Sequence, residues 1–239
     1  MYVDDLIITG SSHVNIDKFK REMMSIFQMS DLGLLIYFLG IEVSQGEGGI
    51  TLCQSAYASK LLERSGMEGC NTCHASLEER LKLSKASTTP PVDAMHYRSI
   101  VGGLRYLVHT RPDIVFVMGY VSQYMEDPRE DHYAAVKHLL RYVASTHEYS
   151  VVYKKEGGAA LVLTWCSGSD MAGDLDGRKS TTSVLFLPGH SPISWQSGQI
   201  DLEFAESERQ LTDILTKPLG RVWFQELRAR IGAIEIKKA

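Results

Sequence analysis

The chain has 239 residues with 44% apolar content, which allows one large domain or two small ones with a real core. Its net charge of -4 and pI near 6.1 lack the strongly basic character of a compact nucleic-acid-binding protein, so such contacts would be local. It has no apolar run of membrane-spanning length, no secretory leader pattern, and only four unevenly placed cysteines. We therefore expect a soluble intracellular protein, cytoplasmic or nuclear, with reduced thiols.

The chain begins with two adjacent carboxylates, Asp4 and Asp5, inside a run of strand-forming residues from Tyr2 to Gly10. This pattern predicts two short strands joined at the carboxylates, which would then lie at an exposed hairpin tip. Paired carboxylates in that position can grip divalent cations, as in two-metal phosphoryl transfer. An Asp-Asp pair is also ordinary turn chemistry, so both interpretations stay open at this point.

A helix is predicted next, because apolar residues recur at helical spacing from Ile16 to Phe27. Ser12 and Asn15 are both suitable N-caps for it. The spacing places the apolar residues on one side, so we expect this stripe to pack against the rest of the protein.

A second hairpin is predicted from Tyr37–Val43 and Ile50–Leu52, which flank a Gly-rich turn. Ala56–Ser65 is predicted to be a short helix with one apolar face. Leu77–Val92 is polar and ends in two prolines, which is typical of an exposed connector.

Three helical patterns follow and indicate a helical block: Tyr97–Val108, Asp113–Met125 and Asp131–Ala144. The stretch from Lys60 to Arg111 has eight Lys or Arg residues against five Asp or Glu residues. It is either a local nucleic-acid contact or an ordinary solvated face.

From Ser150 the pattern changes to that of strands, which predicts a meander over Val151–Tyr153, Leu161–Trp165, Thr181–Leu187 and Ile193–Trp195. Beyond Ser197 the sequence is polar and helical, and no further strand is predicted. The meander therefore stops short of a usual sheet and should leave a strand edge exposed.

Two groups of side chains match metal or cofactor patterns weakly. Cys70–His74 has the spacing of c-type haem attachment, but an incidental pair of loop cysteines is the better interpretation, and zinc lacks a second ligand pair. His132 and His138 are six residues apart and do not share a helix face, so cap or solvent roles are expected.

A loop after the strand ending at Trp165 carries the acidic residues Asp170, Asp174 and Asp176. Their spacing is compatible with a cation site, but Asp-Gly loops are more often turns.

Several further motifs occur along the chain in a fixed order: Tyr2–Gly10, Asp31–Gly33, Tyr37–Val43, Gln54–Ala58, Tyr97–Gly102, Leu104–Leu107, Thr110–Asp113, Met125–Pro128, Asp170–Asp174, Gly177–Thr181, Pro192–Trp195 and Gln210–Leu219. In this order they resemble the copia-type retrotransposon Pol polyprotein, where reverse transcriptase runs into ribonuclease H. The resemblance covers nearly the whole chain. It implies that Asp4 and Asp5 are two of three metal-binding aspartates of the polymerase palm.

The resemblance implies an α+β fold in four segments. Residues 1–55 would be a partial palm with two β-hairpins, a helix and a primer-grip-like hairpin, and residues 56–148 a helical thumb and connection region. Residues 149–197 would be the N-terminal part of a ribonuclease H-like meander, and residues 198–239 its C-terminal helical remnant. The ancestral activity would be RNA-directed DNA polymerisation with Mg²⁺, and RNA or an RNA–DNA hybrid would be the partner.

The departures from the family pattern predict that this activity is lost. The family places its first palm aspartate upstream of Tyr2. In the ribonuclease H part, Gly168 occupies the place of the first aspartate, Asp170 keeps the second acid of that run, and Asp213 matches the fourth metal ligand. The segment that would carry the other two ligands is missing after Ser197.

No spacing argues that Glu203, Glu206 or Glu208 replaces the missing ligands. We therefore expect a truncated, internally deleted pseudoenzyme with incomplete sites at Asp4, Asp5, Asp170 and Asp213. The alternative is a co-opted module that binds nucleic acid or a protein through its thumb and connection helices.

Overall fold

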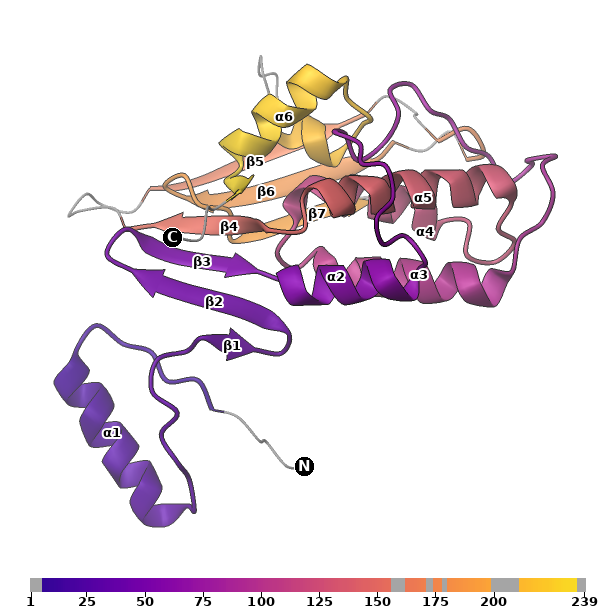
Figure 1. Ribbon diagram of the computed structural model, residues 1–239. Coiled ribbons are helices and arrows are strands. Elements are labelled where there is room, and N and C mark those ends of the chain that lie inside the picture. Colours follow the sequence, from indigo (N-terminus) through magenta and orange to yellow (C-terminus); the bar gives the residue numbers. More distant parts are fainter. Residues whose placement is uncertain (1–5, 156–161, 171–173, 178–179, 199–210, 236–239) are drawn as a thin grey trace.

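The computed structural model describes residues 6–155, 162–170, 174–177, 180–198 and 211–235, and it is an α+β structure (Figure 1). Its helices are α1 (His13–Ile26), α2 (Ser55–Arg64), α3 (Ala94–Leu107), α4 (Val115–Ser122), α5 (Glu130–Ser145) and α6 (Arg221–Arg230), with the 3-10 helices η1 (Pro112–Ile114) and η2 (Leu211–Leu215). Its strands are β1 (Tyr37–Phe38), β2 (Ile41–Gly46), β3 (Gly49–Cys53), β4 (Tyr149–Lys154), β5 (Leu163–Ser169), β6 (Thr182–Pro188), β7 (Ser194–Gly198) and β8 (Ala233–Glu235).

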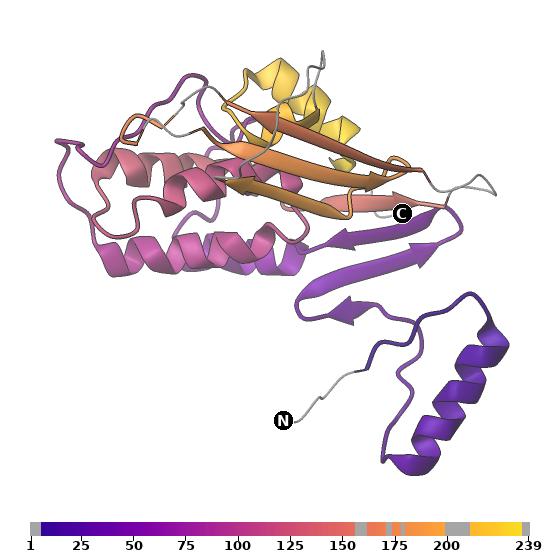
Figure 2. The same cartoon turned by 180° about the vertical axis from the view of Figure 1, so that it is seen from behind.

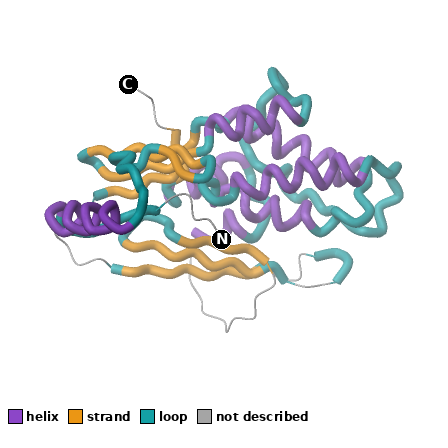
Figure 3. Tube along the Cα trace, turned by 90° about the horizontal axis from the view of Figure 1, so that it is seen from below, coloured by secondary structure: helices purple, strands orange, loops and turns teal. Residues whose placement is uncertain are grey.

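The helical block forms most of the core. Helices α2 to α5 lie at one end of both sheets, which form separate layers when seen from below (Figure 3). Tyr97, Leu104, Leu139 and Leu140 are fully buried there, as the apolar periodicity predicts. The three predicted helices of this block are confirmed, although the middle one begins as η1 before continuing as α4.

The first sheet has the order β1-β2-β3-β4-β8 and is antiparallel throughout. Thr51 of β3 faces Val152 of β4, and Val151 faces Ala233 of β8. The predicted β2–β3 hairpin is confirmed. The assignment of Val151–Tyr153 to the later meander is wrong, because this segment lies in β4, which pairs with β3 in the first sheet. The prediction of no strand after Ser197 is also wrong, because β8 pairs with the other edge of β4.

The predicted strand Tyr37–Val43 is interrupted at Leu39 and Gly40, whose φ angles are +46° and +78°. Two consecutive positive φ angles are those of a tight hairpin turn. The turn folds β1 back onto β2, so that Tyr37 faces Glu42.

The second sheet is the meander β5-β6-β7, which packs its inner face on η2 and α4 (Figure 2). Leu185 and Leu187 of β6 point to that face and are buried. Trp195 of β7 donates its indole N–H to the carbonyl of Val108, with a distance of 2.9 Å between the nitrogen and the oxygen. The meander is therefore joined directly to the helical block.

The connector 77–92 contains no helix, as predicted, but it is not simply exposed. Leu77 and Leu83 are both only 2% exposed, and the backbone N–H of Leu83 donates to the hydroxyl of Tyr120. Two buried leucines thus hold the connector against the core.

Helix α1 begins after Ser12, whose hydroxyl accepts the N–H of Asn15, so the predicted cap is confirmed. The predicted packing of its apolar stripe is wrong: none of its residues is buried, and α1 projects away from the rest of the chain (Figures 1 and 2). Phe19 is 44% exposed and Ile26 is 71% exposed. Ile16 and Phe19 line a hollow together with the adjacent segment 6–12.

The predicted opening hairpin falls partly on residues 1–5, which lie outside the described residues. Its second strand, Leu6–Gly10, is not formed, because a single hairpin is marginal unless further strands or a helix cover it. Among the described helices, none has the length and apolarity needed to cross a membrane.

Candidate functional site

The candidate site is the place where β5 meets η2. The hydroxyl of the fully buried Ser183 on β6 lies 3.4 Å from the carbonyl oxygen of Gly168 and 3.3 Å from that of Thr212. Two segments more than forty residues apart in sequence are thereby held together. Position 168 and Asp213, which the sequence singles out as the first and fourth ligand positions, therefore belong to one small region.

The carboxylate of Asp213 is paired with a cation. Lys217 lies one helical turn further along, and its Nζ is 3.0 Å from Oδ1 of Asp213. Backbone N–H groups of Thr216 and Lys217 donate to the carbonyl of Asp213 and fix the turn. Position 168 offers no side-chain oxygen, since it is glycine, so positions 168 and 213 together supply one carboxylate, which faces the ammonium group of Lys217.

Asp170 lies just beyond the end of β5 and closes the β5–β6 hairpin. Its backbone N–H donates to the carbonyl of Thr181 over 3.0 Å, and its carboxylate accepts the N–H of Thr181 in return. The side chain is thus engaged with the backbone of the neighbouring strand.

Of the two acids further along this loop, Asp174 is a turn residue and Asp176 binds the connector 77–92. Asp174 accepts the N–H groups of Asp176 and Gly177, over 3.1 Å and 2.9 Å. Asp176 accepts the hydroxyl of Ser84 over 2.6 Å and the N–H of Lys85 over 2.8 Å. These bonds, the Ser84 bond first, lower the pKa of Asp176. Turn chemistry, the stronger of the two interpretations, therefore describes Asp174, whereas Asp176 joins the loop to the connector 77–92.

The structure describes two of the predicted carboxylate ligands, Asp170 and Asp213. In the part of the chain that the structure describes, no three His, Cys, Asp or Glu side chains form a group able to hold a metal ion. Asp4, Asp5, Glu203, Glu206 and Glu208 lie outside the described residues.

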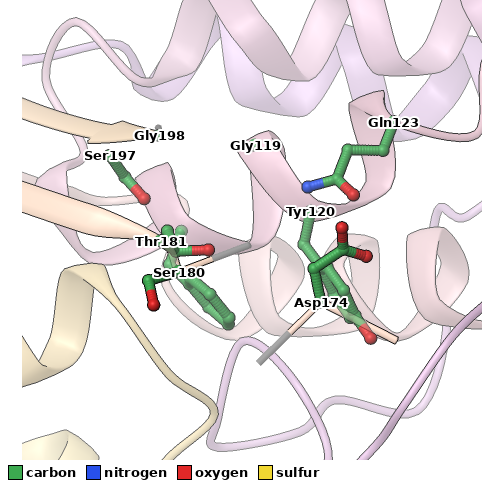
Figure 4. Close-up of a pocket in the computed structure, with 9 residues that line it drawn as sticks. Gly119, Tyr120, Gln123, Asp174, Ser180, Thr181, Ser197 and Gly198 are labelled. Carbon is green, nitrogen blue, oxygen red and sulfur yellow. The ribbon is translucent and has the colours of Figure 1, made fainter. Parts of the chain in front are cut away.

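A small cavity of about 60 Å³ lies between α4 and the end of the meander (Figure 4). It has room for a few water molecules and not for a nucleotide. Its lining residues are Phe116, Gly119, Tyr120, Gln123, Asp174, Ser180, Thr181, Ser197 and Gly198.

A buried ionic network lies between η1, the C-terminal end of α5 and α6. It was not predicted from the sequence. Arg111 donates two hydrogen bonds to the carboxylate of Asp113, over 2.9 Å and 2.8 Å, and two more to Thr146. The hydroxyl of Tyr142 donates to Asp113 over 2.6 Å and accepts a hydrogen bond from Arg228 of α6. The network therefore connects η1, α5 and the C-terminal helix.

The electrostatics of this network are those of a structural ion pair. Burial alone would raise the pKa of Asp113, but the adjacent Arg111 and the hydroxyl of Tyr142 hold it below its ordinary value. Burial also raises the pKa of Tyr142. Arg111 donates four hydrogen bonds and Asp113 accepts three, all with protein groups, so we assign the network a structural role. The only sequence signal is the Thr110–Asp113 motif, which gives no hint of burial.

The remaining candidate ligands also have structural roles. Cys70 and Cys73 are free thiols, and burial raises the pKa of Cys73. The predicted cap role of His132 is confirmed, because its Nδ1 accepts the N–H of Arg129 at the start of α5. His132 is fully buried, so the alternative of a solvent role is wrong for this residue. The Nε2 atom of His138 hydrogen-bonds the carbonyl of Ala75.

Comparison with known proteins gives consistent matches. The family model described as "Reverse transcriptase (RNA-dependent DNA polymerase)" matches residues 1–79. The Retrovirus-related Pol polyprotein from transposon RE1 of Arabidopsis thaliana is 39% identical over 97% of this chain, and that from transposon TNT 1-94 of Nicotiana tabacum is 36% identical over 97%. The chain spans only 16% and 18% of the lengths of these two polyproteins.

A shorter relative is matched over most of its own length. An uncharacterized mitochondrial protein of Arabidopsis thaliana is 36% identical over 82% of this chain and 81% of the relative. No solved structure matches the chain.

Proposed function

Since the chain belongs to the Pol polyprotein family of copia-type retrotransposons and corresponds to part of its reverse transcriptase, we propose that it continues into a ribonuclease H-like segment whose hydrolytic centre is lost. The observation that carries this proposal is the junction of β5 and η2. There Gly168 offers no carboxylate, and Oδ1 of Asp213 faces the ammonium group of Lys217 at 3.0 Å.

The carboxylates of this region do not fit a two-metal Mg²⁺ centre. Such a centre needs several carboxylates directed at two ions about 3.5–4 Å apart. Asp170 and Asp174 instead accept backbone N–H groups in turns, and Asp213 faces an ammonium group. Lys217 would also compete with a cation for Oδ1 of Asp213.

The four segments proposed from the family resemblance are 1–55 for the palm remnant, 56–148 for the thumb and connection, and 149–197 and 198–239 for the ribonuclease H-like parts. The β2–β3 hairpin, the helical block and the β5–β7 meander are compatible with this division. One sheet nevertheless joins strands from three of the four segments.

A metal-binding measurement tests the ribonuclease H part. Calorimetric titration of the chain with Mn²⁺ should give the same weak binding for the wild type and for Asp213→Asn, because Lys217 already balances that carboxylate. Asp127→Asn, which alters an exposed acid that pairs with Arg129, controls for the loss of one charge. A site of micromolar affinity that Asp213→Asn alone removes would refute the proposal.

The polymerase part retains Asp4 and Asp5 as proposed metal ligands. The family resemblance places a third aspartate upstream of Tyr2, so the 239-residue chain would need that part of the palm from a longer or second polypeptide. We expect no primer extension on a homopolymer template with Mg²⁺ or Mn²⁺ above that of an Asp4→Ala, Asp5→Ala control. Extension above that control would overturn this expectation.

The alternative function, a binding module for RNA or an RNA–DNA hybrid, is supported by one observation. Among the described residues, the helical block holds most of the largest fully buried side chains and would serve as a rigid scaffold. Arg111 does not add to its basic surface, because it is buried against Asp113. Binding through phosphates should weaken steeply as the salt concentration rises. If the purified chain shows no salt-sensitive binding to an RNA–DNA hybrid, the nucleic-acid-binding function is excluded.

A further inference from the structure

Strand β5 is an edge of the second sheet. Among the described residues it pairs with β6 alone, in an antiparallel ladder. Next to its ends, Gly189 donates its backbone N–H to Val162, and Asp170 donates to Thr181. Hydrogen-bonded pairs alternate with non-bonded pairs in such a ladder, so even-numbered residues of β5 bond to β6. The backbone groups pointing away from the sheet are those of Leu163, Trp165, Ser167 and Ser169.

The sequence of β5 does nothing to protect this edge. Exposed edges are usually protected by short strands, by Lys or other charges, or by Pro. Leu163–Ser169 is seven residues long and contains no charged residue and no proline. The edges of the first sheet are much shorter, with two residues in β1 and three in β8.

The face beside this edge is apolar and exposed. Leu163 and Trp165 are each 60% exposed, and Phe186 is 36% exposed. Trp165 and Phe186 are direct cross-strand neighbours and therefore lie on the same side of the sheet. A contiguous apolar face beside an open strand edge is typical of an interaction surface.

We propose that β5 pairs antiparallel with β5 of a second copy of this chain. The partner edge must be an extended strand without charges that would be desolvated, and β5 itself meets that requirement. Two copies of this uncharged strand do not repel each other, and a two-fold axis presents the same surface from both sides. The two three-stranded sheets would then form one continuous sheet, and the apolar faces beside the edges would meet.

In one register between the two β5 strands, all four residues with outward-pointing backbone groups form hydrogen-bonded pairs. In it, Leu163 pairs with Ser169 of the second copy and Trp165 pairs with Ser167 of the second copy. The axis then passes beside Cys166, which faces its own equivalent as a non-hydrogen-bonded pair. The Cα atoms of such pairs are about 4.5 Å apart, within the range that a disulfide spans.

Sedimentation of the full chain tests the proposal, with Ser167→Pro as the disrupting variant. The N–H of Ser167 points away from β6, so proline there leaves the β5–β6 ladder intact and blocks only the open edge. Ser167→Ala is the matched control. We expect a concentration-dependent dimer for the wild type and Ser167→Ala, and at least tenfold weaker association for Ser167→Pro with an unchanged circular dichroism spectrum.

Disulfide trapping gives a second readout that does not depend on the proline. Mild oxidation with diamide, which takes up the two thiol protons and two electrons, should yield a covalent dimer in the wild type and none in Cys166→Ser. Cys53→Ser, which removes another partly exposed thiol, should leave the yield unchanged. A wild type that is monomeric at all concentrations, or a dimer that persists in Ser167→Pro with its Cys166 cross-link absent, would overturn the proposal.

Discussion

The buried pair of Arg111 and Asp113 should be the most sensitive electrostatic interaction of the chain. Asp113→Ala removes the carboxylate that accepts two bonds from Arg111 and one from Tyr142. Arg111 would keep only its two bonds to Thr146. The guanidinium group would then remain buried without a counter-ion.

The expected loss is large because both ions are buried. Breaking a buried pair by removing one partner costs roughly 3–5 kcal/mol of unfolding free energy. For a chain of this size that corresponds to a fall in melting temperature of roughly 6–20 °C. Urea unfolding followed by circular dichroism measures the change. The double variant Arg111→Met, Asp113→Leu removes both charges and should recover most of the loss.

Asp127→Ala is the control for this prediction. Asp127 is also bound to an arginine, with 2.6 Å between its Oδ2 and Nη2 of Arg129, but its side chain is 62% exposed. Exposed pairs contribute about 0–1 kcal/mol, so this variant should be nearly neutral. Equal losses for Asp113→Ala and Asp127→Ala would refute the reasoning that burial decides the cost.

The remaining predictions concern pH, packing and local stability. Because the folded-state pKa of Asp113 is depressed, its ionised carboxylate stabilises the fold above the unfolded pKa of about 3.9, and this stabilisation is lost as the pH falls through the folded-state pKa. The free energy of unfolding of Asp113→Ala should therefore depend less steeply on acid pH than that of the wild type. An unchanged dependence would contradict the direction of the pKa shift. Gly103→Ala should lower the free energy of unfolding by about 1–3 kcal/mol, since the new Cβ would lie 2.5 Å from Cδ1 of Leu61. In Gly102→Ala the new Cβ meets no atom within 4 Å, so this variant should stabilise α3 by up to about 1 kcal/mol. Equal urea midpoints for these two variants would show that α2 and α3 do not pack as described. In limited proteolysis the exposed α1 arm should be cut before the block 97–144, and early cuts inside that block would contradict the core described here.

Local patterns of the sequence were sufficient to predict the helices of the block and the β2–β3 hairpin. In both cases the signal lies within about fifteen residues, as helical spacing from Asp131 to Ala144 or as a glycine turn between two apolar runs. The pairing of β4 with β3 is different, because the partners are about a hundred residues apart. No local pattern specifies which of several strand edges β4 will join.

The candidate site was only partly predictable for a related reason. The acids Asp170, Asp174 and Asp176 have a composition that suits either a cation site or a turn, and only their hydrogen bonds to backbone N–H groups distinguish the two. The residue type alone does not distinguish a buried arginine such as Arg111 from one on the surface. Its role becomes visible only when Asp113 and Thr146 are placed around it.

Cleavage of a labelled RNA–DNA hybrid tests the central claim most directly. The assay compares the wild-type chain with Asp213→Ala, in Mg²⁺ and in Mn²⁺. Because Gly168 supplies no carboxylate and Lys217 holds Asp213, we predict that both proteins leave the hybrid intact to the same extent. Cleavage by the wild type that Asp213→Ala abolishes would contradict the claim that the hydrolytic centre is lost.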